Sequence, residues 1–345
     1  MKNNNNQRKL EHIDVALANQ EVDRNGRHFD QVKLIHRALP EVDYAAVDPS
    51  VEFLGHKLAF PLLISAMTGG SDNKLFEINR NLALAAQHCN VAMAVGSQRV
   101  AFSSDSAKKS FQLREFAPSA LLFANLGAVQ LNYGFGAKEC QEAVNLLCAD
   151  ALVLHLNPLQ EVIQRGGDTN FSSLIEKIAR VRDRLSVPVI LKEVGSGFSP
   201  ADAQLALNYG LNTIDISGCG GTSWSLVEQV RNTNESLPCD LGELFQDWGI
   251  STPAALKLLR AESDQLNLIA SGGIRSGIDM AKASILGAGL CGAALPFLAP
   301  ALISAESVID RIEKIKKEFV VAMFLLGCDC FDGLQGNSQL LLPEV

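Results

Sequence analysis

The sequence predicts an α/β fold and, within that class, a closed (β/α)8 TIM barrel. Eight short apolar segments each end abruptly at a polar or glycine-rich tip, and stretches of helical character separate them. Alternation of strand and helix favours a parallel sheet, and eight such units favour closure into a barrel. An open, doubly wound sheet is the alternative. In a barrel the carboxyl ends of the strands carry the chemistry, so the eight tips are where function is expected.

The chain of 345 residues divides into an arm, a barrel and a tail. The arm, 1–57, begins with an asparagine run whose composition is typical of disorder; the barrel spans 58–327, and the tail is 328–345. The strands are predicted, in order, at 58–66, 91–96, 121–125, 151–156, 188–194, 213–217, 267–271 and 289–295. Helices are predicted at 73–88, 137–148, 172–185 and 307–326, with three more that begin at Pro200, Thr252 and Ser276.

Local signals support several of these elements. Apolar residues in 174–185 recur at helical spacing, and Pro200 suits the first position of a helix. No internal sequence repeat is visible. A long insertion, 218–250, follows the sixth strand and contains the polar stretch 231–238. We expect a lid or a mobile loop there, because loops of this length are usually functional.

Composition limits the classes of function. A net charge of −8 argues against nucleic acid as the main partner, so an anionic ligand must be held by a local cluster of cations. The eight cysteines show no metal-type spacing, and most lie in apolar runs, as Cys148, Cys219 and Cys291 do. Reduced thiols and the lack of a secretory-type apolar stretch predict a cytoplasmic protein. The uncharged segment 283–305 is long enough to span a membrane, but its glycines and prolines favour a helix end, a strand and a helix start.

The tips of the seventh and eighth strands form the best candidate phosphate site. Gly272 and Gly273 would let the backbone approach a ligand closely, and Arg275 adds positive charge. Barrels often bind phosphate with the loops after these two strands and a helix N-terminus. A glycine-rich turn without a ligand is the alternative.

The tip of the fifth strand carries Lys192. A lysine at a barrel rim can form a Schiff base, pair with a neighbour such as Glu193, or hold a bound anion. A plain salt bridge is as good an interpretation as a catalytic role.

A polar cluster follows the fourth strand: His155, Asn157, Gln160 and Glu161. A single carboxylate suits Mg²⁺, which keeps waters and binds substrate phosphates as well. The alternative is that Gln160 and Glu161 simply open the next helix. Arg8, Lys9 and Arg99 could neutralise an anionic substrate, although solvated surface charge is the simpler interpretation from residues alone.

From Arg8 to about Leu326 the chain resembles the type 2 isopentenyl-diphosphate isomerases, which are flavin-dependent barrels. One shared motif would be weak support, whereas the joint order of many motifs is specific. The matching segments are RKLEHI, ALPE, EFLG, SAMTGG, GSQR, NLGA, HLNPLQE, KEVG, ISGCGGTSW, DWGIST and SGGIRSG.

The resemblance implies FMN at the rim, with Lys192 near the N1/O2 edge of the flavin. The implied FMN-binding residues are Ala66, Met67, Thr68, Ser97, Asn125, Lys192, Ser217, Thr222, Gly273, Ile274, Arg275, Ala293 and Ala294. The implied substrate-binding residues are Arg8, Lys9, Ser97, Gln98, Arg99, His155, Asn157 and Gln160. Gln160, His155 and Lys192 would be catalytic, and Glu161 would bind Mg²⁺.

The implied reaction interconverts isopentenyl and dimethylallyl diphosphate in isoprenoid biosynthesis by adding one proton and removing another. Reduced FMN would support it, with NADPH needed only to reduce the flavin. The family also implies a homo-oligomer, a tetramer or an octamer. One rival is an FMN-dependent 2-hydroxy-acid oxidase, which needs a histidine base after the sixth strand, yet no histidine follows His155. A non-catalytic flavin-binding protein is the second rival.

Overall fold

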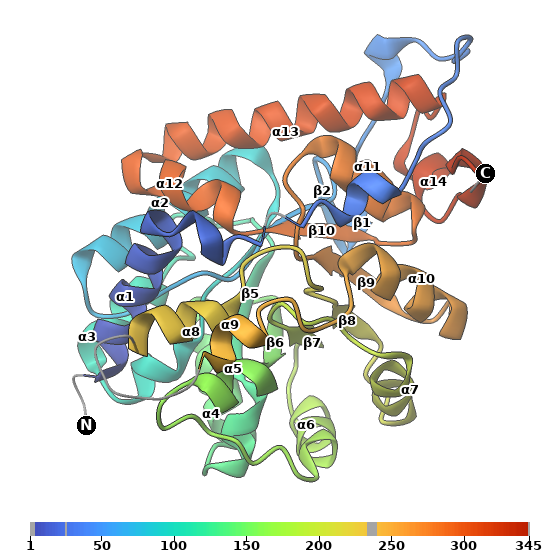
Figure 1. Cartoon of the computed structure of the whole chain (residues 1–345). Helices are drawn as coiled ribbons and strands as arrows, with labels where there is room; N and C mark the ends of the chain where they lie inside the picture. The colour runs from blue at the N-terminus through green and yellow to red at the C-terminus, as the bar shows by residue number, and fades with distance from the viewer. Residues whose placement is uncertain (1–3, 25, 233–239, 344–345) are drawn as a thin grey trace.

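The computed structural model describes residues 4–24, 26–232 and 240–343, and its centre is a closed barrel of eight parallel strands (Figure 1). The strand order around the barrel is β10-β3-β4-β5-β6-β7-β8-β9. The strands are β3 (Leu62–Ile64), β4 (Ala92–Ala94), β5 (Leu122–Gly127), β6 (Ala151–Leu156), β7 (Val189–Glu193), β8 (Thr213–Asp215), β9 (Asn267–Ser271) and β10 (Leu290–Ala293). Because β10 pairs with both β3 and β9, the sheet has no free edge, and the open-sheet alternative is wrong.

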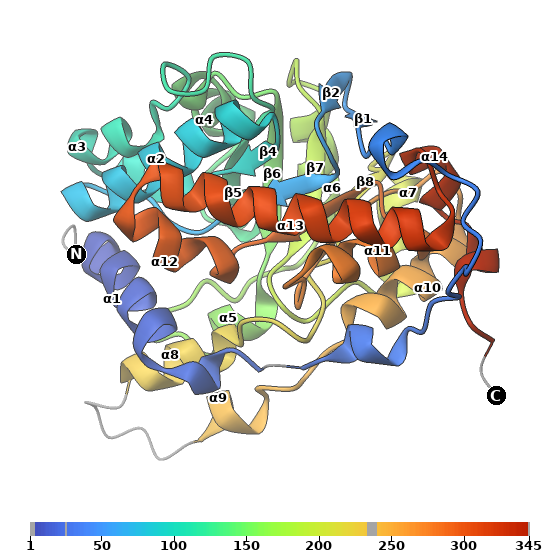
Figure 2. The same cartoon turned by 90° about the horizontal axis from the view of Figure 1, so that it is seen from above.

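Helices surround the barrel, and the seven predicted from the sequence are among them. They are α2 (Asn73–Cys89), α3 (Asp105–Lys108), α4 (Ala137–Leu147), α5 (Pro158–Ile163), α6 (Leu174–Arg182), α7 (Pro200–Asn208), α10 (Thr252–Glu262), α11 (Gly277–Ile285), α12 (Leu295–Ile303) and α13 (Ala305–Leu326). The long helix α13 packs across α2, α11 and α12 (Figure 2). Sequence signals mark the starts: Ser199 and Asp202 form a capping box on α7, and Ser276 and Asp279 form one on α11.

The start of the arm is a helix, so the prediction of a disordered asparagine run is wrong for the part that the structure describes. Helix α1 (Asn4–Ala18) includes the end of that run. It lies against α8 (Trp224–Asn232) in both views (Figures 1 and 2). Buried Val22, Leu226 and Val227 form a small apolar cluster at this joint. Tertiary packing against α8 therefore holds a helix that its composition alone disfavours.

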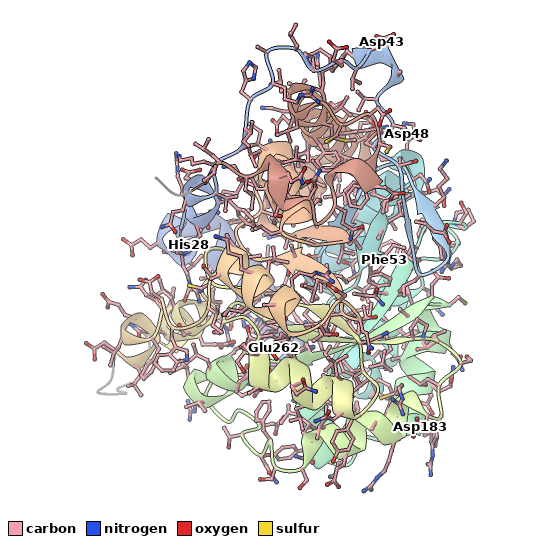
Figure 3. The ribbon with its side chains drawn as sticks, turned by 90° about the vertical axis from the view of Figure 1, so that its right-hand side faces the viewer. His28, Asp43, Asp48, Phe53, Asp183 and Glu262 are labelled. Atoms are coloured by element: carbon pink, nitrogen blue, oxygen red, sulfur yellow. The ribbon has the colours of Figure 1, made fainter. Side chains whose placement is uncertain are left out.

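The end of the arm belongs structurally to the barrel. Strands β1 (Val51–Phe53) and β2 (His56–Leu58) form an antiparallel hairpin. Phe53, labelled in Figure 3, is buried with Leu58 in the same apolar cluster as Leu121 and Leu290, which lie at strand starts. The hairpin thus closes the amino-terminal end of the barrel, and the opposite end is left for ligands.

The insertion after the sixth strand is more regular than predicted. Residues 224–232 form α8, and α9 (Leu241–Leu244) follows. Within it, Glu228 is fully buried, and α8 packs on α1, α5 and α9. Residues 233–239, the core of the expected polar loop, lie outside the described residues. A lid function for 218–250 stays a prediction.

The tail packs against the arm. Helix α14 (Phe331–Leu334) buries Phe331 and Leu334, and isolated bridges join Leu34 to Leu341 and Asp48 to Cys330. The segment 283–305 divides into the end of α11, β10 and α12, as predicted. Over 4–24, 26–232 and 240–343, no helix combines the length and the apolar character that crossing a membrane requires.

Candidate active site

The carboxyl ends of the strands enclose a cavity of about 480 Å³, and α1 covers one side of it. Nearly all of the predicted site residues line this cavity. They are Arg8, Lys9, Ala66, Met67, Thr68, Ser97, Arg99, Asn125, His155, Asn157, Gln160, Glu161, Lys192, Ser217, Thr222, Gly273, Ile274, Arg275, Ala293 and Ala294. The structure therefore brings together residues from the arm, every strand tip and the insertion.

Gln98 is the exception among the predicted substrate-binding residues. Its side chain is fully buried and turned away from the cavity. Its amide donates to the carbonyl of Ala143 and accepts from the backbone N–H of Asn125, both at 2.9 Å. These bonds give Gln98 a structural role, in which it holds the cavity residue Asn125 in place.

The candidate phosphate site at the tips of β9 and β10, here called the phosphate corner, has the geometry that an anion needs. Gly272 and Gly273 have φ values of +92° and +79°, which side-chain-bearing residues rarely adopt. A Cβ on Gly273 would meet the carbonyl oxygen of Gly220 at 3.1 Å. The N-terminus of α12 also lies at the cavity through Leu295, and the partial positive charge of a helix N-terminus favours an anion. The corner can bind a phosphate.

Arg275 completes this corner and joins it to the arm. Its guanidinium forms an ion pair with Asp23 at 2.6 Å and donates to the carbonyls of Gly220 and Gly273. The arm residue Asp23 also forms a β-bridge with Thr222. The arm thus borders the phosphate corner as well as the opposite side of the cavity.

Unpartnered polar atoms point to a polar ligand. Six buried side-chain atoms of the described residues lack a hydrogen-bond partner, and four of them belong to cavity residues. These four are Ser65 Oγ, Thr68 Oγ1, Asn157 Oδ1 and Arg8 Nε. Because an unpaired buried polar atom costs about 1–3 kcal/mol, such a concentration in one cavity favours a ligand that supplies the partners. A flavin with a ribityl phosphate carries suitable donors and acceptors, so the site fits FMN.

Lys192 forms a buried ion pair, but with a residue that the sequence did not indicate. Its Nζ lies 2.8 Å from Asp215 Oδ2, and it donates to Ser271 Oγ at 3.2 Å. Lys192 thus forms a salt bridge, one of the roles left open, but among the described residues its partner is not Glu193. The Glu193 carboxylate accepts instead from the backbone N–H groups of Val194, Gly195 and Ser196.

His155 is a neutral imidazole at the cavity wall. Burial, together with the charges of Lys9 and Lys192, lowers the pKa of His155 to about 3. The Asn125 amide donates to the carbonyl of Val95, so its oxygen faces His155 Nδ1 at 2.7 Å. His155 Nδ1 therefore carries the proton, which leaves Nε2 as a hydrogen-bond acceptor.

Gln160 is linked to a buried carboxylate from the insertion. Its Nε2 donates to Glu228 Oε1 at 2.8 Å, while its Oε1 accepts from Asn157 Nδ2 at 3.0 Å. Glu228 also contacts His12 Nε2 at 3.0 Å and Arg231. Burial opposes ionisation of Glu228, but His12, Arg231 and Gln160 outweigh it and lower its pKa to about 2. The Gln160 amide, which lines the cavity, is therefore hydrogen-bonded to the fully buried carboxylate of Glu228.

Glu161 lies in the first turn of α5 and is nevertheless buried at the cavity. It therefore opens a helix, as the alternative predicted, and lines the site as well. Its Oε2 accepts from the backbone N–H of Asp168 at 2.7 Å, and its Oε1 accepts from Asn157. Over the part of the chain that the structure describes, no group of three or more metal-ligating side chains is present. Glu161 could hold Mg²⁺ only with waters and substrate oxygens completing the shell.

Three cations meet on the cavity wall. Burial chiefly lowers the pKa of Arg8, and burial with the neighbouring Arg8 charge lowers the pKa of Lys9 to about 8. Arg99 forms an ion pair with Asp168 at 2.7 Å. The interpretation as solvated surface charge is therefore wrong for Arg8 and Lys9, whereas the Arg99 side chain stays 35% exposed. Clustered, partly desolvated cations are suited to a doubly charged anion.

Sequence reasoning missed His12, Asp168, Asp215 and Glu228. Asp215 was hidden in an apolar strand, and Glu228 lies in a segment that was expected to be a loop. A signal for Glu228 was present, since apolar Leu226, Val227 and Val230 share a helical spacing in its segment. His12 stands beside the basic pair of the arm, but its partner is 216 residues away.

Comparisons with known proteins agree with this geometry. A family model described as FMN-dependent dehydrogenase matches residues 2–118 and 138–339. The flavin-binding domain of baker's yeast flavocytochrome b2 has a similar fold, with a TM-score of 0.67 and 19% identity over 94% of this chain and 79% of that one. A mandelate oxidase variant gives a TM-score of 0.61 and 19% identity over 96% of this chain and 92% of the other. The fold and the family model together place the chain among the FMN-dependent (β/α)8 enzymes.

Curated relatives narrow the class. Isopentenyl-diphosphate delta-isomerase of Hydrogenovibrio crunogenus is 56% identical over 98% of both chains. The enzyme of that name from Paracoccus zeaxanthinifaciens is 51% identical over 97% of this chain and 96% of its own. The Nostoc enzyme is 44% identical over 96% and 95%. The chain belongs to the FMN-dependent, type 2 isopentenyl-diphosphate isomerase family.

Proposed function

We propose that this protein interconverts isopentenyl diphosphate and dimethylallyl diphosphate with reduced FMN, as a step of isoprenoid biosynthesis. The observation that carries the proposal is the joining of two features in one cavity. A phosphate corner and Lys192 suited to FMN lie on one side, and three cations with the Gln160–Glu228 pair lie on the other. Curated relatives with this name match nearly the whole chain.

The barrel rim would hold FMN. The backbone of Gly273 and the N-terminus of α12 are placed to bind the phosphate, with Arg275 beside them. Thr68 and Ser65 offer unpaired hydroxyls for the polar parts of the cofactor. When bound and reduced, FMN supplies an electron-rich, protonatable ring beside the substrate alkene.

The arm and the segments that follow β4 and β6 would bind the substrate diphosphate. Arg8, Lys9 and Arg99 lie on the cavity wall and can neutralise its charge. Glu161 would bind Mg²⁺ together with the phosphate oxygens. Binding energy from the diphosphate would then fix the five-carbon chain in place, so that remote contacts contribute to the rate.

Proton transfer needs groups that act on carbon in a dry site. An alkene that accepts a proton develops tertiary cation character, which water would capture. Apolar Ile13, Ala16 and Leu298 line the cavity and would help to keep water from the alkene. Gln160 is a poor acid by itself, so we assign it to positioning or relay, with buried Glu228 behind it. Neutral His155 can accept a hydrogen bond through Nε2.

Four further features belong to the same proposal. NADPH would serve only to reduce the flavin, since the isomerisation has no net redox change. A tetramer or octamer is implied by the family, and exposed apolar residues such as Leu39 and Ile303 would suit subunit contacts. A small-molecule partner and no nucleic acid are expected from the acidic net charge. The free thiols of the described cysteines fit a cytoplasmic location.

An anaerobic assay of isopentenyl diphosphate tests the proposal, with FMN, Mg²⁺ and NADPH omitted in turn. We expect activity to require FMN and a reductant, and dithionite to replace NADPH. Equal rates with oxidised or removed FMN would contradict the function. Oxidation of 2-hydroxy acids would favour the oxidase rival, and FMN retention without turnover would favour a non-catalytic protein.

The magnesium assignment has its own test. Glu161→Ala should raise the Mg²⁺ concentration that half-maximal activity requires, because one carboxylate ligand is lost. The variant should retain its FMN absorbance. An unchanged magnesium dependence would remove Glu161 from the site.

A further inference from the structure

A buried carboxylate lies below the cavity at the end of β8. Asp215 is 2% exposed. Its Oδ2 lies 2.8 Å from Lys192 Nζ, and its Oδ1 accepts from the hydroxyl of Ser271. Lys192 in turn donates to Ser271 Oγ at 3.2 Å. Three side chains from the neighbouring strands β7, β8 and β9 therefore form a closed ring of hydrogen bonds.

Asp215 is the carboxylate that neutralises Lys192. On β6, His155 is in register with Lys192, but it is held neutral. From α1, Lys9 adds a like charge at the cavity wall. Glu193 is adjacent in sequence but turns its carboxylate to the backbone N–H groups of 194–196. Among the described residues, Asp215 alone forms an ion pair with Lys192.

The Lys192–Asp215 ion pair has a defined orientation relative to the cavity. Lys192 and Ser271 line the cavity, whereas Asp215 does not. The positive end of the pair therefore faces the ligand, and the negative end lies in the barrel interior. Leaving a buried ammonium group without its counterion is strongly destabilising, so the Asp215 carboxylate helps to fix where this group lies.

We propose that Asp215 is a positioning residue for the flavin environment, which holds the Lys192 side chain aimed at the FMN edge while its carboxylate offsets the Lys192 charge. The inference rests on the FMN of the proposed function, but not on the isomerisation. Asp215 thereby sets how strongly the protein stabilises the negative charge of the reduced cofactor. Through this effect it sets the midpoint potential of FMN.

The test compares the FMN midpoint potential of the wild-type holoenzyme and Asp215→Asn at pH 7. The substitution keeps shape and one acceptor but removes the counter-charge. Lys192 is then an uncompensated cation, and the potential should lie above that of the wild type. An unchanged or lower potential would overturn the proposal.

Two further variants separate charge from structure. Ser271→Ala removes two hydrogen bonds and no charge, so its offset from the wild-type potential should be small. Asp215→Asn combined with Lys192→Met removes both charges, and the rise in potential should disappear. If Asp215→Asn alone fails to fold, rescue of folding by the added Lys192→Met shows that Asp215 compensates this ammonium. A double variant that also fails to fold would make Asp215 purely structural and end the proposal.

The result does not depend on turnover. A wild-type protein without isomerase activity would contradict the proposed function and leave the potential measurement intact. An active enzyme whose potential ignores Asp215 would retain the proposed function and refute this inference.

Discussion

The two sides of the cavity are built in different ways. On the barrel side, Lys192, Asp215 and Ser271 come from adjacent strands whose backbones are hydrogen-bonded to each other. On the arm side, His12 of α1 meets Glu228 of α8, 216 residues away, and no strand pairing connects them. The barrel side is therefore fixed by the fold itself. The arm side depends on packing between two helices that were not expected from the sequence.

This difference assigns separate tasks to the two sides. Parallel strands position a rigid cofactor site, because main-chain pairing leaves each tip little freedom. A helix that packs over the rim can carry charge toward a substrate and also exclude water. Substitutions on the arm side should therefore change turnover and substrate binding while FMN stays bound.

The sharpest test of this separation is Gln160→Ala. We expect kcat to fall by about 10²–10⁴-fold, the range for loss of a group that assists proton transfer. FMN absorbance and affinity should be unchanged, because Gln160 forms hydrogen bonds to Glu228 and Asn157 and not to a residue predicted to bind FMN. Steady-state kinetics and flavin titration measure both. Gln204→Ala, an exposed amide on α7, is the control. Wild-type turnover in Gln160→Ala would remove this residue from the mechanism.

Glu228→Gln probes the buried anion behind Gln160. We expect kcat to fall by about 10–10²-fold, less than for Gln160→Ala, because the cavity amide remains. Acid stability gives a second readout. The folded pKa of about 2 lies below the usual 4.5, so the unfolded chain binds more protons between these values. Wild-type stability should be lost as pH falls through that window, and the variant should lose less there. Parallel acid-unfolding curves would contradict an ionised Glu228.

Lys9 should make substrate capture sensitive to alkaline pH. Its pKa of about 8 means that the free enzyme loses this cation above that pH. We expect kcat/KM for the diphosphate substrate to fall up to about tenfold as pH rises through 8, because kcat/KM reports the free enzyme. Lys9→Arg should keep kcat/KM flat over this range, since arginine stays protonated. A decline of the same size in Lys9→Arg would assign the ionisation to another group.

The barrel side was predicted from the sequence far better than the arm side. Strands 151–156 and 267–271 have the predicted bounds, because a buried strand between polar tips leaves a local signal. Gly273 and Arg275 were found for the same reason. The start of α1 was missed, since its asparagines disfavour a helix that only tertiary contact with α8 stabilises. The partners Asp215 and Glu228 could not be assigned, because ion pairs between distant segments leave no periodic trace.

Asp168 links Arg99 to Glu161 in the proposed diphosphate site. Of the substitutions considered, a change at Asp168 should have the smallest effect. Its carboxylate accepts from Arg99 at 2.7 Å and Gln130 at 3.0 Å, while its backbone N–H donates to Glu161. Asp168→Asn keeps the backbone bond but removes the charge that orients Arg99. We expect KM to rise about 3–10-fold with kcat nearly unchanged, equivalent to about 1 kcal/mol of binding. Asp264→Asn, an almost fully exposed carboxylate, is the control. A lowered kcat at unchanged KM would mean that Asp168 acts in chemistry rather than in holding the arginine.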